Sequence, residues 1–216
     1  MGNSALLAAP KTEKTMEGAS NGVVSWGSCS MQGWRRYMED AHAAVLDLAG
    51  SGVHFFAVYD GHGGAEVAEF CGRHLHNELL HHEEFREGGD LGLACSETFI
   101  HMDQKIVGGA AMVEMLGLAQ SGLAGDEEWE PPSGCTAVAA VVWGTRVVVA
   151  NAGDSRCVVC DSTGKAVPLS FDHKPEDARE QARIYAAGAV VEMGRISSRN
   201  STSALNLTRA IGDLDL

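Results

Sequence analysis

The sequence lacks the features that would place the chain in a membrane or on a nucleic acid. No apolar run approaches the roughly 20 residues needed to span a bilayer, and the N-terminus has no basic segment followed by an apolar core. Basic residues are few: 16 Lys and Arg stand against 29 Asp and Glu, for a net charge of −13. Nucleic-acid binding depends on clustered positive charge. We therefore expect a cytoplasmic and/or nuclear protein with no nucleic acid and no transmembrane span.

Cysteines are also few, and they are scattered at positions 29, 71, 95, 135, 157 and 160. In a reducing compartment they would act as small buried hydrophobes. Cys157 and Cys160 have CxxC spacing, but no second pair completes a zinc site. Residues i and i+3 of a strand also point to opposite faces. The cysteines therefore predict neither a disulfide framework nor a metal site.

The order of strand-like and helix-like segments predicts one α+β domain. Residues 1–22 are small and polar, so we expect a flexible N-terminal arm, and residues 23–216 form the domain. Gly-rich and then acidic composition marks residues 108–132 as an irregular loop insert. Short spacing between strands favours antiparallel pairing. Strands are expected at 23–31, 41–48, 53–59, 136–142, 146–151, 155–160 and 189–193, and helices at 64–82, 91–107 and 175–187.

Several histidines crowd the first expected helix and its end, at positions 74, 76, 81 and 82. A metal site built from His76, His81 and His82 is conceivable, because imidazole is a common metal ligand. An exposed polar helix face is the favoured interpretation.

One short segment joins an apolar strand to acidic, histidine and glycine residues. Residues 53–58 read as a buried strand, and Tyr59-Asp60-Gly61-His62-Gly63-Gly64 follows directly. The carboxylate and the imidazole therefore stand where a strand ends, and the glycines allow close approach of the backbone. With a helix start behind them, they make a site suited to a cation and an anionic substrate. Taken alone, Asp-Gly is more typical of a polar turn.

Further motifs in a fixed order change that interpretation. They are Met31-Gln32-Gly33-Trp34-Arg35-Arg36-Tyr37-Met38-Glu39-Asp40-Ala41-His42, Ser133-Gly134-Cys135-Thr136-Ala137, Asn151-Ala152-Gly153-Asp154-Ser155-Arg156, Asp172-His173-Lys174-Pro175 and Leu205-Asn206-Leu207-Thr208-Arg209-Ala210-Ile211-Gly212-Asp213. In this order they resemble the motifs of metal-dependent PPM-type (type 2C) serine/threonine protein phosphatases, from about Val24 onward. The resemblance implies a four-layer αββα sandwich, with two antiparallel sheets flanked by helices, and phosphoprotein substrates.

The resemblance also implies a site for two divalent cations, Mg²⁺ or Mn²⁺. Hard cations prefer carboxylate, carbonyl and water oxygens, and two of them about 3.5–4 Å apart can activate a water. By resemblance, Asp60, Gly61 and Glu39 are metal ligands, with Asp60 bridging both ions. Asp40 corresponds to the adjacent carboxylate that holds a metal-bound water. Without the family pattern, Glu39 and Asp40 would read as a solvated acidic pair.

Two basic side chains complete the chemistry that the resemblance implies. Arg35 corresponds to the phosphate-binding arginine, whose guanidinium can pair with two phosphate oxygens. His62 corresponds to the general acid that gives a proton to the departing Ser or Thr oxygen, a task suited to an ordinary pKa of about 6.5. Asp154 corresponds to a position linked to a weaker, third metal, and a turn cap is an equal alternative.

The family pattern continues past the motifs found here. Relatives carry a strand that ends in Asp-Gly and a later Asp-Asn turn, and those two aspartates complete one metal position. Neither motif follows the last one here, so we expect a domain that is incomplete at its C-terminus. A catalytically impaired short form, or a pseudophosphatase acting as a phosphoprotein-binding or regulatory module, is the alternative to an active enzyme.

The first residues, Met1-Gly2-Asn3-Ser4, raise one membrane-related expectation. N-myristoylation at Gly2 would give weak membrane association, although Leu6 stands where the usual motif has Ser or Thr. An ordinary, poorly ordered N-terminus is the favoured alternative.

Overall fold

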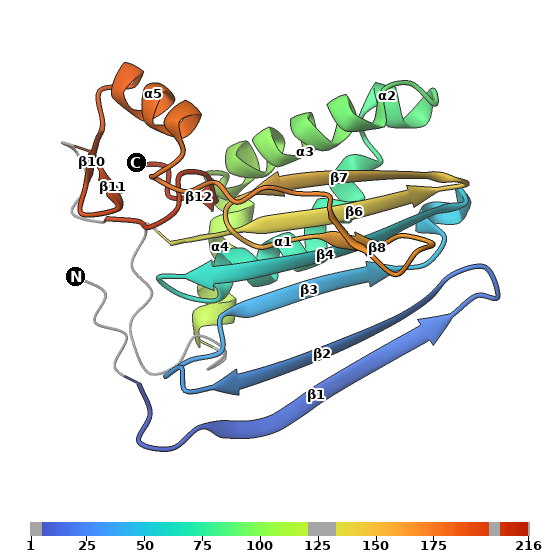
Figure 1. Ribbon diagram of the computed structural model, residues 1–216, viewed down its shortest axis with the longest axis horizontal. Helices are drawn as coiled ribbons and strands as arrows, with labels where there is room; N and C mark the ends of the chain where they lie inside the picture. Colours follow the sequence, from blue (N-terminus) through green and yellow to red (C-terminus); the bar gives the residue numbers. More distant parts are fainter. Residues whose placement is uncertain (1–5, 121–132, 199–203, 216) are drawn as a thin grey trace.

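An antiparallel sheet of six strands forms the centre of the fold (Figure 1). The computed structural model describes residues 6–120, 133–198 and 204–215. The strand order is β12-β5-β4-β6-β7, and β3 also pairs with β4. The strands are β3 (Asp40–Val45), β4 (Val53–His62), β5 (Gly134–Cys135), β6 (Ala137–Trp143), β7 (Arg146–Ala152) and β12 (Ile211–Gly212).

Helices cover one face of this sheet. Side chains alternate between the faces of a strand, and Phe55, Ala57 and Tyr59 of β4 are buried beneath the helices, whereas Val58 is 47% exposed. Two of the helices, α1 and α3, contact the strands directly, and α4 packs on both of them. The four helices are α1 (Glu66–Leu79), α2 (Glu83–Arg86), α3 (Leu91–Ile106) and α4 (Gly109–Gln120).

Smaller elements lie beside the central sheet. A hairpin, β1 (Lys11–Ser20) with β2 (Ser25–Gly33), runs along the uncovered side of β3, where Ser28 Oγ lies 3.2 Å from His42 Nε2. The short helix α5 and a second hairpin lie at the end of the sheet where β4 finishes (Figure 1). The remaining elements are η1 (Leu48–Gly50), β8 (Val158–Cys160), β9 (Ala166–Pro168), α5 (Ala178–Ala186), β10 (Val190–Glu192) and β11 (Arg195–Ser197).

The N-terminal segment is not the flexible arm that its composition suggests. Residues 11–20 form β1, which pairs with β2 along its length. All ten residues of β1 are exposed, so the sequence shows no alternation of apolar and polar residues. The sequence signal for this hairpin is Asn21-Gly22, a dipeptide typical of hairpin turns. Asn21 Oδ1 accepts hydrogen bonds from the N–H groups of Val23 and Val24.

Other expected elements differ in detail. The predicted irregular insert at 108–132 contains helix α4 over Gly109–Gln120, and residues 121–132 lie outside the described residues. Strand β8 pairs with β9 rather than with the central sheet. Helix α5 begins later than predicted, after Asp177, whose carboxylate caps it by accepting from two backbone N–H groups.

The α+β class and the antiparallel pairing are confirmed. The division of the chain at residue 23 stays a prediction. Gly2, the candidate position for N-myristoylation, lies outside the described residues. In the described ranges, every helix falls short of the length or apolar character that a membrane span requires.

Candidate active site at the end of the central sheet

Two aspartates face each other where β3 begins and β4 ends. Asp40 and Asp60 are cross-strand partners, so their side chains share one face of the sheet. Burial, and then the neighbouring Asp60 carboxylate, raises the pKa of Asp40 above its usual value. Neighbouring carboxylates repel each other, and a cation between them would relieve that repulsion. Carboxylate oxygens are the ligands that hard cations prefer.

Gly61 brings a third acidic residue to this place. A Cβ atom at Gly61 would lie 2.4 Å from the carbonyl oxygen of Glu39, so no larger residue fits without a shift of the backbone. The Gly61 N–H donates to that same oxygen at 3.2 Å. The Glu39 side chain accepts from the Gly64 N–H at 3.0 Å. The close approach at Gly61 therefore fixes where the Glu39 carboxylate stands.

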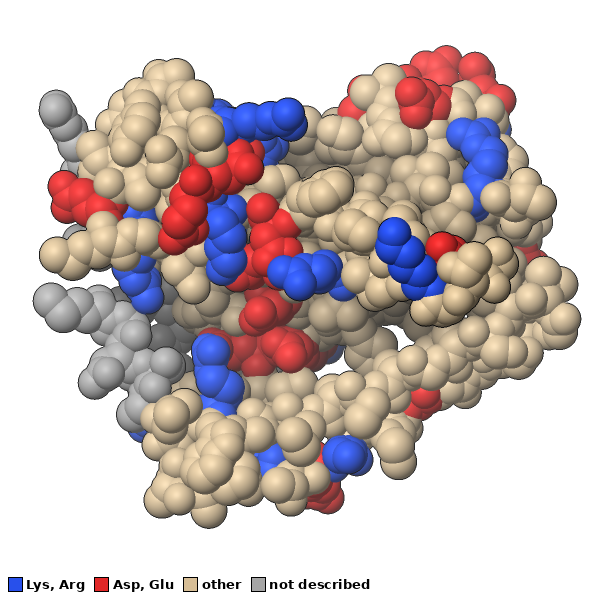
Figure 2. All heavy atoms as spheres, viewed as in Figure 1, with Lys and Arg blue, Asp and Glu red and all other residues tan. Residues whose placement is uncertain are grey.

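A hollow of about 210 Å³ opens over these carboxylates. The Arg35 guanidinium lies 3.6 Å from Glu39 Oε2, and its side chain is 57% exposed. Figure 2 shows acidic side chains gathered in a band across this face of the molecule, with basic side chains along its borders. The hollow is lined by Met31, Gln32, Arg35, Tyr37, Met38, Glu39, Asp40, Asp60 and Gly61.

His62, the last residue of β4, has a partner that the sequence did not reveal. Its Nε2 lies 2.5 Å from Oδ2 of Asp213, which is 8% exposed. Burial alone would lower the pKa of His62, but the hydrogen bond and the charge of Asp213 outweigh it and raise the pKa above its usual value. Gly134 permits this contact, because a Cβ there would lie 2.2 Å from the Asp213 carboxylate.

Asp213 is held in place by the helix layer. It directly follows β12, which pairs with β5 through Ile211 and Gly212. Ile211 is buried in the core, and the Gly212 N–H donates to Oδ1 of Asp103 on α3 at 2.8 Å. The position of α3 therefore helps to set the distance between Asp213 and His62.

Asp60 is held by two hydroxyl residues, Thr136 directly and Ser155 through Thr136. The Thr136 hydroxyl accepts from the Asp60 N–H at 3.1 Å, and the Thr136 N–H donates to the Asp60 carbonyl at 2.9 Å. Ser155 Oγ lies 2.6 Å from Thr136 Oγ1. Both hydroxyls stand in motifs noted in the sequence, so the motifs themselves were the available signal.

Six of the seven predicted site residues come together at this end of the sheet. Five line the hollow, and His62 follows them along β4. Asp154 is not among the residues that line it; its carboxylate forms an ion pair with Lys174. Asp154 is nevertheless the neighbour of Ser155, which reaches Asp60 through Thr136.

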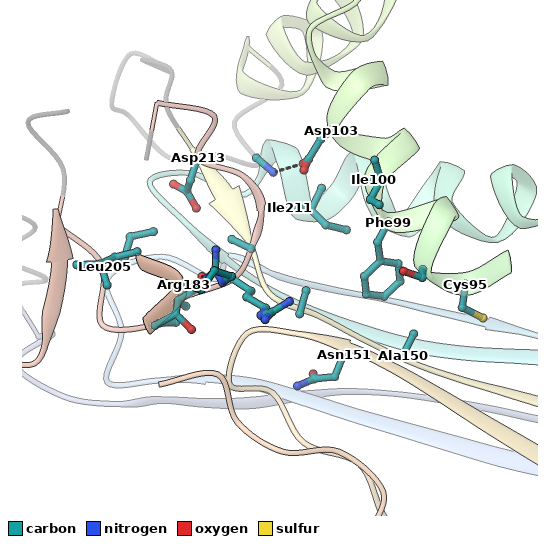
Figure 3. Close-up of a pocket in the computed structure, with 18 of the residues that line it drawn as sticks. Cys95, Phe99, Ile100, Asp103, Ala150, Asn151, Arg183, Leu205, Ile211 and Asp213 are labelled. Carbon is teal, nitrogen blue, oxygen red and sulfur yellow. Dashed lines mark hydrogen bonds between the residues drawn. The ribbon is translucent and has the colours of Figure 1, made fainter. Parts of the chain in front are cut away.

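A larger hollow of about 650 Å³ lies between α3, β7, α5 and residues 205–213. Figure 3 shows Arg183, Leu205 and Asp213 toward one side of it and Phe99 and Ile100 toward the other. Asp213 and Asp103 both line it, whereas none of the seven predicted site residues does. We place the candidate active site at the smaller hollow because the paired carboxylates of Asp40 and Asp60 lie there, although the other hollow is larger.

The helix-covered antiparallel sheet carries an acidic cluster, formed by Glu39, Asp40 and Asp60, at one end of an α+β domain. Comparisons with known proteins identify the family. The family model described as protein phosphatase 2C matches residues 24–216. Probable protein phosphatase 2C 11 of Oryza sativa subsp. japonica is 41% identical over 239 residues, which cover 97% of this chain and 64% of the relative. Protein phosphatase 2C homolog 3 of Schizosaccharomyces pombe is 43% identical over 213 residues, which cover 97% of this chain and 46% of the relative. The chain belongs to the protein phosphatase 2C family.

Solved structures share the fold. A serine-threonine phosphatase 2C from Toxoplasma gondii matches with a TM-score of 0.66 and 20% identity, over 98% of this chain and 72% of that one. A C. elegans sex determining protein matches with a TM-score of 0.62 and 24% identity, over 94% of this chain and 45% of that one. At these identities the likeness concerns the fold alone. The chain spans 64% of the length of the rice relative and 46% of that of the fission yeast relative.

Proposed function

We propose that this chain acts as a protein serine/threonine phosphatase that hydrolyses phosphoserine and phosphothreonine in phosphoprotein substrates, with Mg²⁺ or Mn²⁺ as cofactor. The observation that carries the proposal is the pairing of Asp40 with Asp60 beneath one hollow that Arg35 also lines. Anionic and cationic side chains around one small opening suit a substrate that arrives together with metal ions.

The residues present fit divalent cations. The neighbouring carboxylates of Asp40 and Asp60 repel each other, and a bound cation would remove that repulsion. Glu39 adds a third carboxylate at the same hollow. Such an all-oxygen set, completed by the Gly61 carbonyl, suits Mg²⁺ or Mn²⁺. When bound, such a cation would supply a nucleophilic water at neutral pH and positive charge to offset the phosphate.

Arg35 binds the substrate in this proposal. Its guanidinium is more than half exposed and borders the hollow, so it can turn from Glu39 toward a phosphate. The planar fork of an arginine can donate two parallel hydrogen bonds to phosphate oxygens. Arg35 thereby orients the phosphorus atom toward the carboxylate side of the hollow.

His62 and Asp213 manage the proton. The water oxygen forms a bond to phosphorus while the ester P–O bond breaks, and the departing Ser or Thr oxygen takes a proton from the His62 imidazolium. One proton of the water stays on the phosphate and the other restores the imidazolium. Asp213 holds the ring by its Nε2, so Nδ1 is the nitrogen that would give the proton to the leaving group.

The test is hydrolysis of a phosphothreonine peptide by the 216-residue chain, with phosphotyrosine peptide as the specificity control. We expect phosphate release that stops in excess EDTA and returns with Mn²⁺. Release that continues in EDTA would overturn the proposed cofactor. Binding of the phosphopeptide without release would favour the alternative, a pseudophosphatase that acts as a phosphoprotein-binding module.

A further inference from the structure

A second cluster of ionisable side chains lies at the far end of α1. Helix α1 begins at Glu66, shortly after His62, and runs for 14 residues. Its length is about 20 Å at 1.5 Å per residue. Near its last turn, Glu78 meets His82, which directly precedes α2, and His101 on α3. One ligand atom from each of these three residues lies within 4.8 Å of the other two.

His82 is the central member of the cluster and differs from the exposed face expected from sequence. Its side chain is 5% exposed, and Nδ1 lies 3.2 Å from Oε2 of Glu97. Nε2 is buried and has no hydrogen-bond partner among the described residues, and leaving such an atom unsatisfied is unfavourable. If Nδ1–H donates to Glu97, the free lone pair stands on Nε2. A carboxylate that orients a histidine in this way is a regular feature of metal sites.

Glu78 and His101 supply the other two groups. The rings of His82 and His101 stack with centroids 4.8 Å apart, and His101 Nδ1 lies 3.7 Å from Oε1 of Glu78. Burial would raise the pKa of Glu78, but the hydrogen bond and charge of Lys105, with the nearby histidines, lower it instead. Glu78 therefore remains a carboxylate, 7% exposed, beside two imidazoles.

We propose that Glu78, His82 and His101 form a zinc-binding site, separate from the acidic cluster of the proposed phosphatase reaction. Two imidazole nitrogens and one carboxylate oxygen suit Zn²⁺, whereas Mg²⁺ and Mn²⁺ favour all-oxygen sets. Ligand atoms around a tetrahedral zinc are about 3.3 Å apart, so small rotations of Glu78 and His101 close the site. A water takes the fourth position.

Lys105 is a competing partner of Glu78. Its ammonium forms an ion pair with Glu78, and its side chain is 44% exposed. It can therefore swing into solvent when zinc binds. The bound ion would link the end of α1 to α3, the helix that holds β12 through Asp103. Zinc binding is thus expected to stabilise the helix layer that positions Asp213.

The experiment titrates Zn²⁺ into the chelator-treated chain by calorimetry in excess Mg²⁺, which occupies the acidic cluster. Thermal melts and the visible absorption of Co²⁺ in place of zinc accompany it. His101→Gln is the test variant, because that side chain is 47% exposed and its loss leaves the fold intact. His81→Gln is the matched control: it is 72% exposed and also near Glu78, but outside the ligand set.

We expect one zinc per chain, a rise in melting temperature and a tetrahedral Co²⁺ spectrum. His101→Gln should weaken zinc binding at least about 10-fold, His81→Gln should not, and Lys105→Met should bind zinc at least as tightly as the wild type. Absence of zinc binding by the wild type, or equal loss in His81→Gln and His101→Gln, would overturn the proposal.

Discussion

Glu180 ties helix α5 to the segment that carries Asp213. Its carboxylate side chain is 7% exposed and accepts from Arg209 Nη2 at 2.7 Å and Nε at 2.9 Å. The Thr208 hydroxyl donates at 2.7 Å and Arg183 Nη2 at 3.1 Å. Because Thr208 and Arg209 lie just before β12, one carboxylate secures both α5 and the segment that leads to Asp213. We expect Glu180→Gln to destabilise the fold.

The magnitude follows from the pKa of Glu180. The hydrogen bonds from Arg209 are the largest cause, and they lower the pKa of Glu180 from 4.5 to about 2. Burial opposes this shift, whereas the hydrogen bonds from Thr208 and Arg183 add to it. At neutral pH this difference corresponds to about 3 kcal/mol. Both arginines are nearly half exposed, so solvent screening reduces the expected loss to about 2 kcal/mol. A depressed folded-state pKa means that this stability is fully present above about pH 4.5 and is lost as the pH falls through about 2.

The measurement is the free energy of unfolding in urea for wild type and Glu180→Gln at several pH values. The difference should be about 2 kcal/mol near neutral pH and should shrink as the pH falls toward about 3. Glu192→Gln, at an exposed position on β10, is the control and should differ little from wild type. A difference that stays constant with pH, or that the control shares, would refute the reasoning.

Three further predictions concern the active site. His62→Gln should lower the turnover of a phosphopeptide while calorimetry still detects Mn²⁺ binding; unchanged turnover would mean that His62 supplies no proton. Arg35→Ala should mainly raise KM, by a factor that corresponds to about 1.5–3 kcal/mol for one lost charge-assisted contact. An unchanged KM with unchanged turnover would mean that Arg35 does not contact the substrate phosphate. Gly61→Ala should destabilise the fold by about 1–3 kcal/mol and weaken Mn²⁺ binding, because the new Cβ meets the Glu39 carbonyl. Gly109→Ala, where a Cβ meets open space, is its control, and equal effects of the two substitutions would contradict the clash.

The parts of the fold that bury one face were predictable from sequence. Strands β3, β4, β6 and β7 and helices α1 and α3 appear close to their expected ranges, because burial imposes a period on their apolar residues. Strand β1 has no buried face and left no such pattern. Helix α4 is not evident from the sequence, because its glycines and the acidic residues after it have the composition of a loop, although Met115 within it is fully buried.

The candidate active site also has parts that the sequence predicts and parts that it does not. Asp40, Asp60 and Gly61 stand at the ends of predictable strands, so short motifs place them together. Asp213 lies 151 residues from His62, and their contact depends on a two-residue pairing of β12 with β5. Strands that short carry no periodic pattern, so the tertiary structure alone reveals the partner.

The central claim is that the carboxylates around Asp60 hold divalent cations, and calorimetric titration with Mn²⁺ tests it most directly. Asp60→Asn removes one charge from the pair with Asp40 and should abolish Mn²⁺ binding at this site and phosphopeptide turnover. Asp161→Asn is the matched control, because Asn keeps the side-chain oxygen that accepts the N–H groups of Thr163 and Lys165 in an exposed turn. We predict that Asp161→Asn binds Mn²⁺ like the wild type, whereas wild-type affinity and turnover in Asp60→Asn would contradict the account.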